Sequence, residues 1–447
     1  MKKMKHTLIA SALLLCGVAA FGQDFSTGYF LEGYTYSYRM NPALRPSRSF
    51  LALPGISNIS ANLHGNVGID SFYFPLDNGK LGTFRNAGVS SSEFLGGLPE
   101  KPKASLDVTT NALAFGFKTG DIFHTVDVNV RSVNGLSTGK DLFRYIKDGA
   151  EGTIDIPKLN FDNQTFVEVA YGMSRPIGDI VVFGARLKLL AGAEMLHADV
   201  SDIRITNNGE SETISAKGTL TGAIKGIEVI TGPSSDGSAN DVVRWDDLHM
   251  KDIDGAAGFG AALDLGAEVK AFPGLYLSAA ITDLGGIGWK APLNAETGAT
   301  SWETESTGTF DTDGIIDMME FHQKGQGNLF KFLPTTLRLG AEYKLSDKIG
   351  FGALATQRFG PFSLTELRGS ANAFVGKFLG FSASAAYSNY GFSWGAALNI
   401  DARAFDFFLG FDSIPTRFST QWIPLGTGNV AATFGLVITF GKRAAFF

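Results

Sequence analysis

Large apolar residues alternate with small or polar residues along much of the chain. From residue 430 to 440 every second position is apolar and mostly large, whereas the positions between are mostly small. Residues 259–271 carry apolar side chains on one face and Asp264, Glu268 and Lys270 on the other. A strand that crosses a bilayer shows one face to lipid and the other to the lumen, which gives a repeat of two over about ten residues. The pattern therefore predicts membrane-crossing β-strands.

This pattern recurs about fourteen times, and the irregular segment 106–117 leaves a range of about twelve to sixteen strands. In that segment the apolar face changes midway, as a β-bulge would cause. The predicted strands are residues 58–68, 105–118, 123–133, 165–174, 179–196, 258–271, 275–284, 335–345, 349–358, 366–375, 379–388, 392–400, 404–411 and 430–440. We therefore expect an all-β protein, a transmembrane antiparallel β-barrel.

The connections between these strands are alternately short and long. Tight turns are predicted near Gly120, Pro176, Pro273, Ser346, Lys377 and Asp401. The long segments are residues 69–104, 134–164, 197–257, 285–334 and 412–429. Bacterial barrels have short periplasmic turns and long extracellular loops, so the long segments are expected outside the cell. Within one of them, Asn207-Asn208-Gly209 predicts a hairpin that lies outside the membrane.

The N-terminus has the features of a targeting segment. Lysines at positions 2, 3 and 5 precede an apolar run over residues 8–20, and Ala20-Phe21-Gly22 fits a small-x-small cleavage site. The one cysteine, Cys16, lies in that run after Leu15, which is a poor fit to a lipoprotein signal. If the signal peptide is cleaved, the mature chain contains no cysteine, which excludes disulfides, thiol catalysis and cysteine metal sites. We expect a cleaved signal peptide (1–22), an N-terminal periplasmic or plug segment (23–57) and a barrel (58–447) in the outer membrane of a Gram-negative bacterium.

Composition supports lipid-facing strands and limits the partners. The 447 residues include 55 glycines and 37 phenylalanines, and only 18% are charged. The formal net charge of −6 disfavours nucleic acid as a partner. Outer-membrane lipid is therefore the first expected partner.

No motif in the sequence points convincingly to enzyme chemistry. Residues 391–395 fit the G-x-S-x-G pattern, but alternation continues through them, whereas a nucleophile elbow needs a sharp strand-to-helix turn. The carboxylates of Asp311, Asp313 and Asp317 could offer oxygen ligands to calcium, yet the loop departs from the EF-hand pattern, so an ordinary acidic external loop is preferred. The histidines are scattered. We predict no enzyme activity, no cofactor and no metal.

Charged side chains on the face opposite the lipid must meet water or one another, because a charge in hydrocarbon is costly. They are Asp127, Arg131, Glu168, Arg186, Lys188, Asp264, Glu268, Arg338, Glu342, Arg358, Glu366 and Arg368. One interpretation is an ion-pair network that fixes the barrel shape and holds the N-terminal segment. The other is a polar conduit that guides a substrate. We prefer the network.

Several short motifs carry a resemblance to a known family. Met40-Asn41-Pro42-Ala43, residues 174–177, residues 258–266 and the run 283–289 (DLGGIGW) resemble a barrel family of the Bacteroidota that is similar to the fatty-acid transporter FadL and to PorV-type secretion barrels. The resemblance implies a barrel of about fourteen strands whose N-terminal segment, here 24–57, folds inward as a plug. Only Asn41, Pro42 and Ala43 are carried over as residues of the substrate path.

Tyr34, Tyr36 and Tyr38 make that segment rich in aromatic residues. They suit a partly apolar pocket on the substrate path, or they simply pack against the wall. Our first hypothesis is passive, FadL-like uptake of a small hydrophobic or amphipathic molecule. The alternative is a PorV-like scaffold whose external loops dock a surface protein. An outer-membrane enzyme ranks last.

Overall fold

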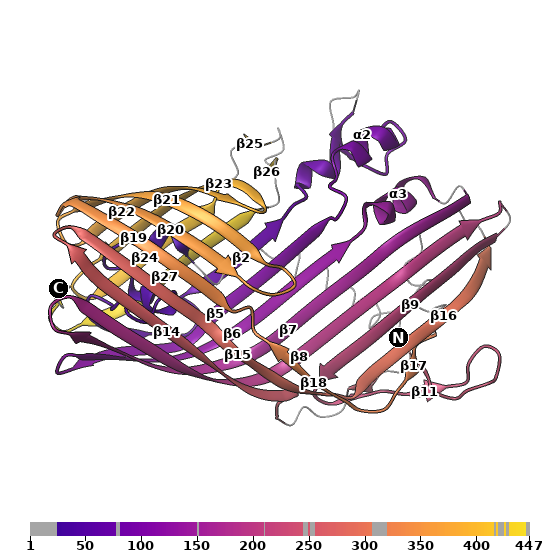
Figure 1. Cartoon of the computed structure of the whole chain (residues 1–447), viewed down its shortest axis with the longest axis horizontal. Helices are drawn as coiled ribbons and strands as arrows, with labels where there is room; N and C mark the ends of the chain where they lie inside the picture. The colour runs from indigo at the N-terminus through magenta and orange to yellow at the C-terminus, as the bar shows by residue number, and fades with distance from the viewer. Residues whose placement is uncertain are drawn as a thin grey trace.

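A computed structural model gives the structure of the chain, and it describes residues 25–76, 81–149, 152–209, 211–244, 249–250, 255–305, 320–414, 417–418, 424–425 and 429–443. The predicted signal peptide, Cys16 and the acidic loop 311–317 lie outside these residues. The described chain forms an elongated barrel whose wall continues on one side into a long curved sheet (Figure 1).

Over the described residues the wall is a closed ring of fourteen antiparallel strands, which confirms the predicted barrel. One position is shared by β1 (Ser49–Ala52) and β2 (Ile59–Gly65), and another by β18 (Gly327–Phe332) and β19 (Thr336–Ser346). The others are β5 (Lys103–Thr119), β6 (Ile122–Thr138), β7 (Gly152–Ile177), β8 (Val181–Asn207), β14 (Gly258–Phe272), β15 (Leu275–Ala291), β20 (Ile349–Arg358), β21 (Leu364–Val375), β22 (Leu379–Ser388), β23 (Gly391–Asp401), β24 (Phe405–Ser413) and β27 (Val430–Phe440). The ring closes because β27 pairs with β24 on one edge and with β1 and β2 on the other.

The wall has an apolar outer face and a polar inner face. On β8, Leu189 is 60% exposed whereas Arg186 is 2% exposed, and on β21 Leu367 is 64% exposed whereas Arg368 is 3% exposed. This is the alternation that lipid outside and a closed interior require. None of the helices in the described part of the chain is long and apolar enough to cross a membrane.

The wall has several register shifts, and two of them bear on the sequence analysis and the interior. The β5–β6 register skips a residue between Asn111 and Leu113, which confirms the predicted bulge. In the second, Leu263 and Leu265 of β14 pair with Leu284 and Ile281, so β15 has two residues opposite one. One of these two residues, Asp283, has φ of 60°, a left-handed conformation that aspartate tolerates better than most side chains.

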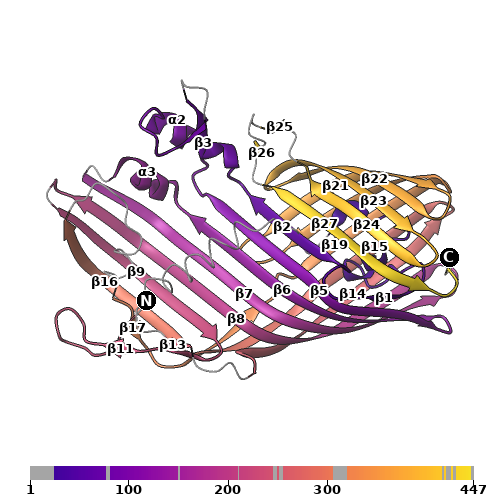
Figure 2. The ribbon, with the colours of Figure 1, turned by 180° about the vertical axis from the view of Figure 1, so that it is seen from behind.

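The tight turns are confirmed, but the long segments differ from the prediction. β7 and β8 run for 26 and 27 residues, far past the membrane, and β9 (Ser211–Ile224) and β16 (Leu293–Glu305) extend the same sheet (Figure 2). Much of 134–164, 197–257 and 285–334 is therefore wall and not loop, because strands that meet water on both faces lose the alternation that marks them in sequence. The predicted hairpin at residues 207–209 joins β8 to β9.

The remaining elements are short. They are η1 (Ser26–Gly28), η2 (Thr35–Arg39), η3 (Ile69–Ser71), α2 (Ser91–Gly96), α3 (Lys140–Asp148), β3 (Tyr73–Pro75), β4 (Leu81–Thr83), β10 (Ile227–Glu228), β11 (Thr231–Gly232), β12 (Val242–Val243), β13 (His249–Met250), β17 (His322–Gln323), β25 (Arg417–Phe418) and β26 (Pro424–Leu425). Helices α2 and α3 lie beyond the rim from which β7 and β8 extend. We call this rim extracellular and the opposite end periplasmic, because bacterial barrels have their short turns on the periplasmic side.

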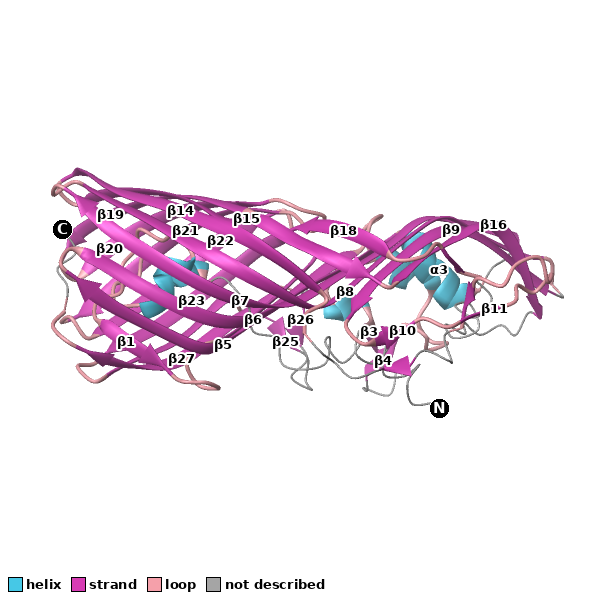
Figure 3. Cartoon of the chain, turned by 90° about the horizontal axis from the view of Figure 1, so that it is seen from below, coloured by secondary structure: helices cyan, strands magenta, loops and turns pink. Residues whose placement is uncertain are grey.

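Residues 25–48, which we call the N-terminal segment, lie inside the barrel, where the two short helical turns η1 and η2 are visible through the wall (Figure 3). Tyr34 packs on Phe408 with ring centroids 5.0 Å apart, and Tyr36 packs on Phe50 at 6.1 Å. The wall begins at β1, because Ser49 pairs with Phe440 of β27. The wall thus includes residues 49–52, which the sequence assigned to the N-terminal segment.

Candidate functional site

The motif Asn41-Pro42-Ala43 holds the N-terminal segment against the wall. The Asn41 amide donates a hydrogen bond of 3.0 Å to the Tyr29 hydroxyl, and its carbonyl oxygen accepts the Ala43 N–H at 3.0 Å. Pro42 lies so close to Gly184 of β8 that an added Cβ there would be 2.1 Å from the Pro42 carbonyl carbon. A Cβ at Gly266 of β14 would be 2.0 Å from Asn41 Oδ1. The motifs at residues 40–43 and 258–266 therefore meet in the fold.

Aspartates on the wall accept hydrogen bonds from the N-terminal segment along its length. Asp412 accepts the N–H groups of Ser26 at 2.7 Å and Thr27 at 2.6 Å. Asp406 accepts the N–H of Thr35 at 3.1 Å and also its hydroxyl. Charge-assisted hydrogen bonds of this kind are stronger than neutral ones. The aspartates that hold the segment in this way are Asp127, Asp401, Asp406 and Asp412.

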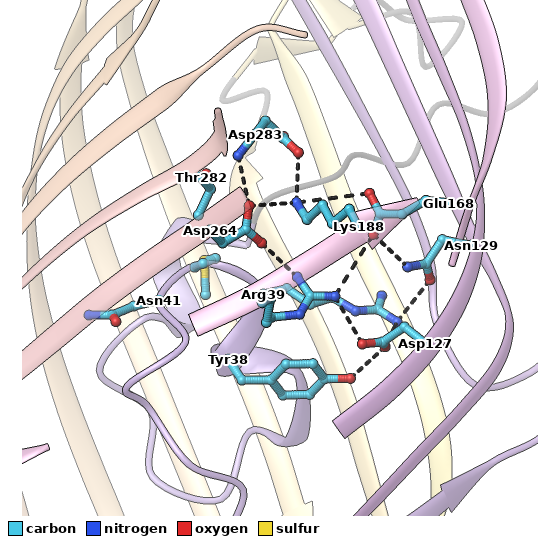
Figure 4. A network of polar contacts seen from close by, with 12 residues as sticks. Tyr38, Arg39, Asn41, Asp127, Asn129, Glu168, Lys188, Asp264, Thr282 and Asp283 are labelled. Carbon is cyan, nitrogen blue, oxygen red and sulfur yellow. Dashed lines mark hydrogen bonds and ion pairs between the residues drawn. The ribbon is translucent and has the colours of Figure 1, made fainter. Parts of the chain in front are cut away.

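Asp127 joins the N-terminal segment to the charges of the wall (Figure 4). It accepts a hydrogen bond of 2.6 Å from the Tyr38 hydroxyl and forms ion pairs with Arg39 at 2.8 Å and Arg186 at 2.9 Å. Burial on its own would lower the pKa of Arg39, but Asp127, Tyr38 and Tyr36 together more than offset it, and the pKa lies above its ordinary value. Arg39 is therefore a permanent cation in the interior.

Eight charged side chains, which we call the lumen ion cluster, form one connected network. Arg131 pairs with Glu168 at 2.6 Å and with Asp283 at 2.8 Å. Lys188 lies 2.6 Å from Asp283 and 2.8 Å from Asp264. Its cations are Arg39, Arg131, Arg186 and Lys188, and its carboxylates are Asp127, Glu168, Asp264 and Asp283. The four charges of each sign cancel, as buried charges require.

The other predicted lumen residues lie apart from this cluster. Arg338 donates to the Met40 carbonyl at 3.4 Å and to Thr282 at 3.1 Å. Arg358 forms an ion pair with Asp107. Arg368 lies 2.9 Å from Glu366 and 3.8 Å from Asp412. Glu268 and Glu342 line a cavity at the periplasmic end.

Sequence reasoning missed Arg39, Asp107, Asp283, Asp401, Asp406 and Asp412. Asp406 could have been found, because it lies in a predicted strand opposite the apolar positions Phe405 and Phe407. Asp283 could not have been found from the sequence, because strict alternation from Leu277 through Ile281 would place it on the lipid face. The bulge turns it inward instead.

An apolar layer lies directly extracellular to the lumen ion cluster. Its buried members are Phe166, Leu190, Met195, Ile287, Trp289 and Leu333, with smaller residues between them. Arg131 borders the layer, with its guanidinium carbon 5.2 Å from the centroid of the Phe166 ring. Trp289 is 1% exposed, and within the described residues its indole N–H has no acceptor. The interior thus changes from apolar to ionic to aromatic toward the periplasm.

The remaining motifs form no catalytic site in the described chain. Residues 391–395 lie within β23 and pair regularly with β22, without the turn of a nucleophile elbow. His64 stacks on Tyr390, His124 contacts Tyr171, and His322 bonds to Asp241. The described residues contain no group of three or more side chains arranged to bind a metal.

The chain belongs to the protein family described as "Family of unknown function (DUF5723)", which matches residues 42–412. No curated protein matches the sequence. Similar solved structures include the Ralstonia pickettii toluene transporter TbuX, with 10% identity, coverage of 94% of this chain and 99% of that chain, and a TM-score of 0.46.

Two further structures are similar to this chain in the same way. A Pseudomonas aeruginosa FadL homologue has 11% identity, coverage of 94% and 98%, and a TM-score of 0.43. The Pseudomonas putida toluene transporter TodX has 11% identity, coverage of 91% and 93%, and a TM-score of 0.41. These solved structures are what the chain is similar to, and its function is argued below from its own residues.

Proposed function

We propose that this barrel is a passive uptake channel of the outer membrane for a small hydrophobic or amphipathic molecule, closed by its N-terminal segment. The observation that carries the proposal is that residues 25–48 fill the interior yet add no strand to the wall. Their contacts with the wall are hydrogen bonds, ion pairs and packing. Such a segment can move without breaking the strand pairing that closes the barrel.

The apolar layer supports a hydrophobic cargo. The lumen of a diffusion porin is polar and filled with water. Here Phe166, Ile287 and Trp289 pack together inside the barrel on the extracellular side. Apolar surface of this kind favours an apolar molecule over a hydrated one.

Opening requires the N-terminal segment to leave the lumen ion cluster. Asp127 would then lose Arg39 and Tyr38 but keep Arg186 as its partner. The wall part of the cluster would hold three cations and four carboxylates, because Arg39 is the member that the segment supplies. Water entering with the cargo would solvate the remaining charge. Uptake of this kind needs no cofactor and no chemical step.

A reversible lock tests the proposal. The hydroxyl oxygens of Thr27 and Ser384 are 2.8 Å apart, so the double variant Thr27→Cys/Ser384→Cys should form a disulfide between the N-terminal segment and β22. We would express it in a Gram-negative host that lacks its own hydrophobic uptake barrel and measure entry of radiolabelled toluene and oleate. We expect uptake to be lost in the oxidised form and restored by a reductant.

Each single cysteine variant is the matched control and should behave as the wild type. Equal uptake by the oxidised and the reduced double variant would contradict the proposal that the N-terminal segment closes the channel. A second readout is ligand-extraction mass spectrometry on the purified barrel with and without residues 25–47, a deletion that leaves β1 intact. If no form of the barrel passes either solute and none yields an extracted ligand, the uptake proposal is overturned.

One observation favours a second function, the docking of a surface protein. The wall extends beyond the membrane through β7, β8, β9 and β16, and helices α2 and α3 lie over the same side. A passive channel does not need so large an extracellular sheet. Crosslinking on intact cells followed by mass spectrometry would test this function. Docking would be favoured if one partner recurs in the crosslinks and a strain without this barrel still takes up the solutes at wild-type levels.

A further inference from the structure

A cavity of about 60 Å³ lies at the periplasmic end of the interior, between the N-terminal segment and strands β14, β15 and β19. Its lining includes three carboxylates, those of Glu32, Glu268 and Glu342, and two cations, Arg45 and Lys344. The lining therefore has one carboxylate more than it has cations. This excess distinguishes the cavity from the lumen ion cluster, in which the charges cancel.

The buried carboxylate of Glu342 has an incomplete set of partners. The residue is 6% exposed, its Oε1 has no hydrogen-bond partner, and its Oε2 is 4.0 Å from the Lys344 ammonium. Lys344 itself pairs more closely with Glu32. Glu268 makes neither a hydrogen bond nor an ion pair with the residues that the structure describes. A buried carboxylate without a partner is costly, so this place favours an added cation.

Aromatic side chains complete the lining of the cavity. Tyr29, Phe30, Tyr34 and Tyr276 lie around it. The Lys344 ammonium is 4.8 Å from the centroid of the Tyr276 ring, so an alkylammonium already rests on an aromatic face beside carboxylates. Aromatic rings combined with carboxylates are the surroundings in which proteins bind organic ammonium ions.

We propose that this cavity binds a small organic cation, a primary or methylated ammonium, that enters from the periplasmic side. Glu342 and Glu268 are its counter-ions, and the aromatic rings contact its alkyl part. One water needs about 10–15 Å³, so the cavity has room for about four groups of that size. That fits an ion such as ethylammonium. The described residues show no arrangement that suits a bare metal ion.

Isothermal titration of the full mature chain in detergent tests the proposal with ethylammonium chloride as the probe. Ethanol is the neutral control of similar size, sodium chloride is the control for ionic strength, and magnesium chloride tests for a metal site. We expect ethylammonium to bind saturably, and we expect no saturable binding of ethanol, sodium or magnesium. Glu342→Gln and Glu268→Gln should each weaken it by at least ~10-fold, because each removes a counter-ion from the cavity lining.

Glu100→Gln is the matched control variant, because the Glu100 side chain is 86% exposed and lies in an external segment. It should bind ethylammonium as the wild type does. Equal heats for ethylammonium and sodium chloride, binding of magnesium in its place, or full affinity in both cavity variants would each overturn the proposal. If the cavity variants fail to fold, the wild-type comparison of ethylammonium with ethanol decides.

Discussion

Arg131 and Asp283 form a two-point ion pair, with Nη1–Oδ1 at 2.8 Å and Nη2–Oδ2 at 2.9 Å. Their strands, β6 and β15, are not neighbours, because β7, β8 and β14 lie between them in the wall. The pair therefore spans the concave inner face of five consecutive strands. It exists only because the β15 bulge turns Asp283 inward.

Replacing Asp283 should destabilise the barrel strongly. Asp283→Ala leaves Arg131 and Lys188 buried without that carboxylate, which costs on the order of 3–5 kcal/mol. Urea unfolding of the purified barrel in lipid measures the loss. Asp155→Ala is the control, because Asp155 and Arg204 are both 62% exposed, and it should leave the unfolding midpoint unchanged. Similar midpoints for the two variants would contradict a structural role for the lumen ion cluster.

Replacing Gly184 should displace the N-terminal segment without altering the outer face of the wall. Gly184→Ala places a methyl group where the Pro42 carbonyl now lies, and backbone cannot move aside as a flexible side chain can. We expect faster proteolysis within residues 25–48 and, if that segment is the gate, increased uptake. Gly369→Ala in β21 is the control, because its Cβ would meet no atom within 4 Å. An equal rate of proteolysis in both variants would contradict the docking described for Pro42.

The membrane part of the fold could be predicted from sequence because lipid imposes a repeat of two on every crossing strand. Residues 349–358, 379–388 and 430–440 were predicted with the bounds that β20, β22 and β27 have. Outside the membrane the same constraint is absent, so the sequence pattern predicts loops where β7 and β8 extend. The four residues of β1 are too few to show the repeat.

The interior was predicted less completely, for a different reason. Alternation identifies which face of a strand a charge occupies, and in the structure Arg131, Glu168 and Arg186 are buried on the inner face. It cannot say which charges pair, because the partners lie on strands far apart in sequence. It also fails at a bulge, where one extra residue exchanges the two faces. Asp283 shows both effects.

The turn over residues 234–239 should lose stability in acid between about pH 3.8 and pH 2. Hydrogen bonds from Ser234 and Ser238 lower the pKa of the exposed Asp236 carboxyl to about 2, from an ordinary value of 3.8. Because the pKa is lower in the folded state, the stabilising effect is present above pH 3.8 and is lost as the pH falls toward 2. Carbon NMR of labelled Asp236 measures the titration, and Ser234→Ala should raise the midpoint. A wild-type midpoint at the ordinary value would show that the hydrogen bonds do not form.

Trp289 should make the apolar layer prefer cargo that carries a hydrogen-bond acceptor. Its buried indole N–H has no acceptor in the described chain, and an unsatisfied buried donor favours any ligand that can pair with it. We therefore expect the wild type to bind benzyl alcohol more tightly than toluene, after correction for their different partition into water. Trp289→Phe keeps an aromatic ring but removes the donor. It should therefore weaken the binding of benzyl alcohol by about 2- to 10-fold and leave the binding of toluene nearly unchanged.

Competition against a radiolabelled hydrocarbon measures both affinities in the same detergent. Leu190→Met is the matched control, because it changes the shape of the same layer without touching a polar group. It should affect the two ligands to a similar, small extent. If Trp289→Phe loses the same affinity for both ligands, the Trp289 ring matters only for packing. No effect on either ligand would place the cargo elsewhere in the barrel and remove the apolar layer from the uptake path.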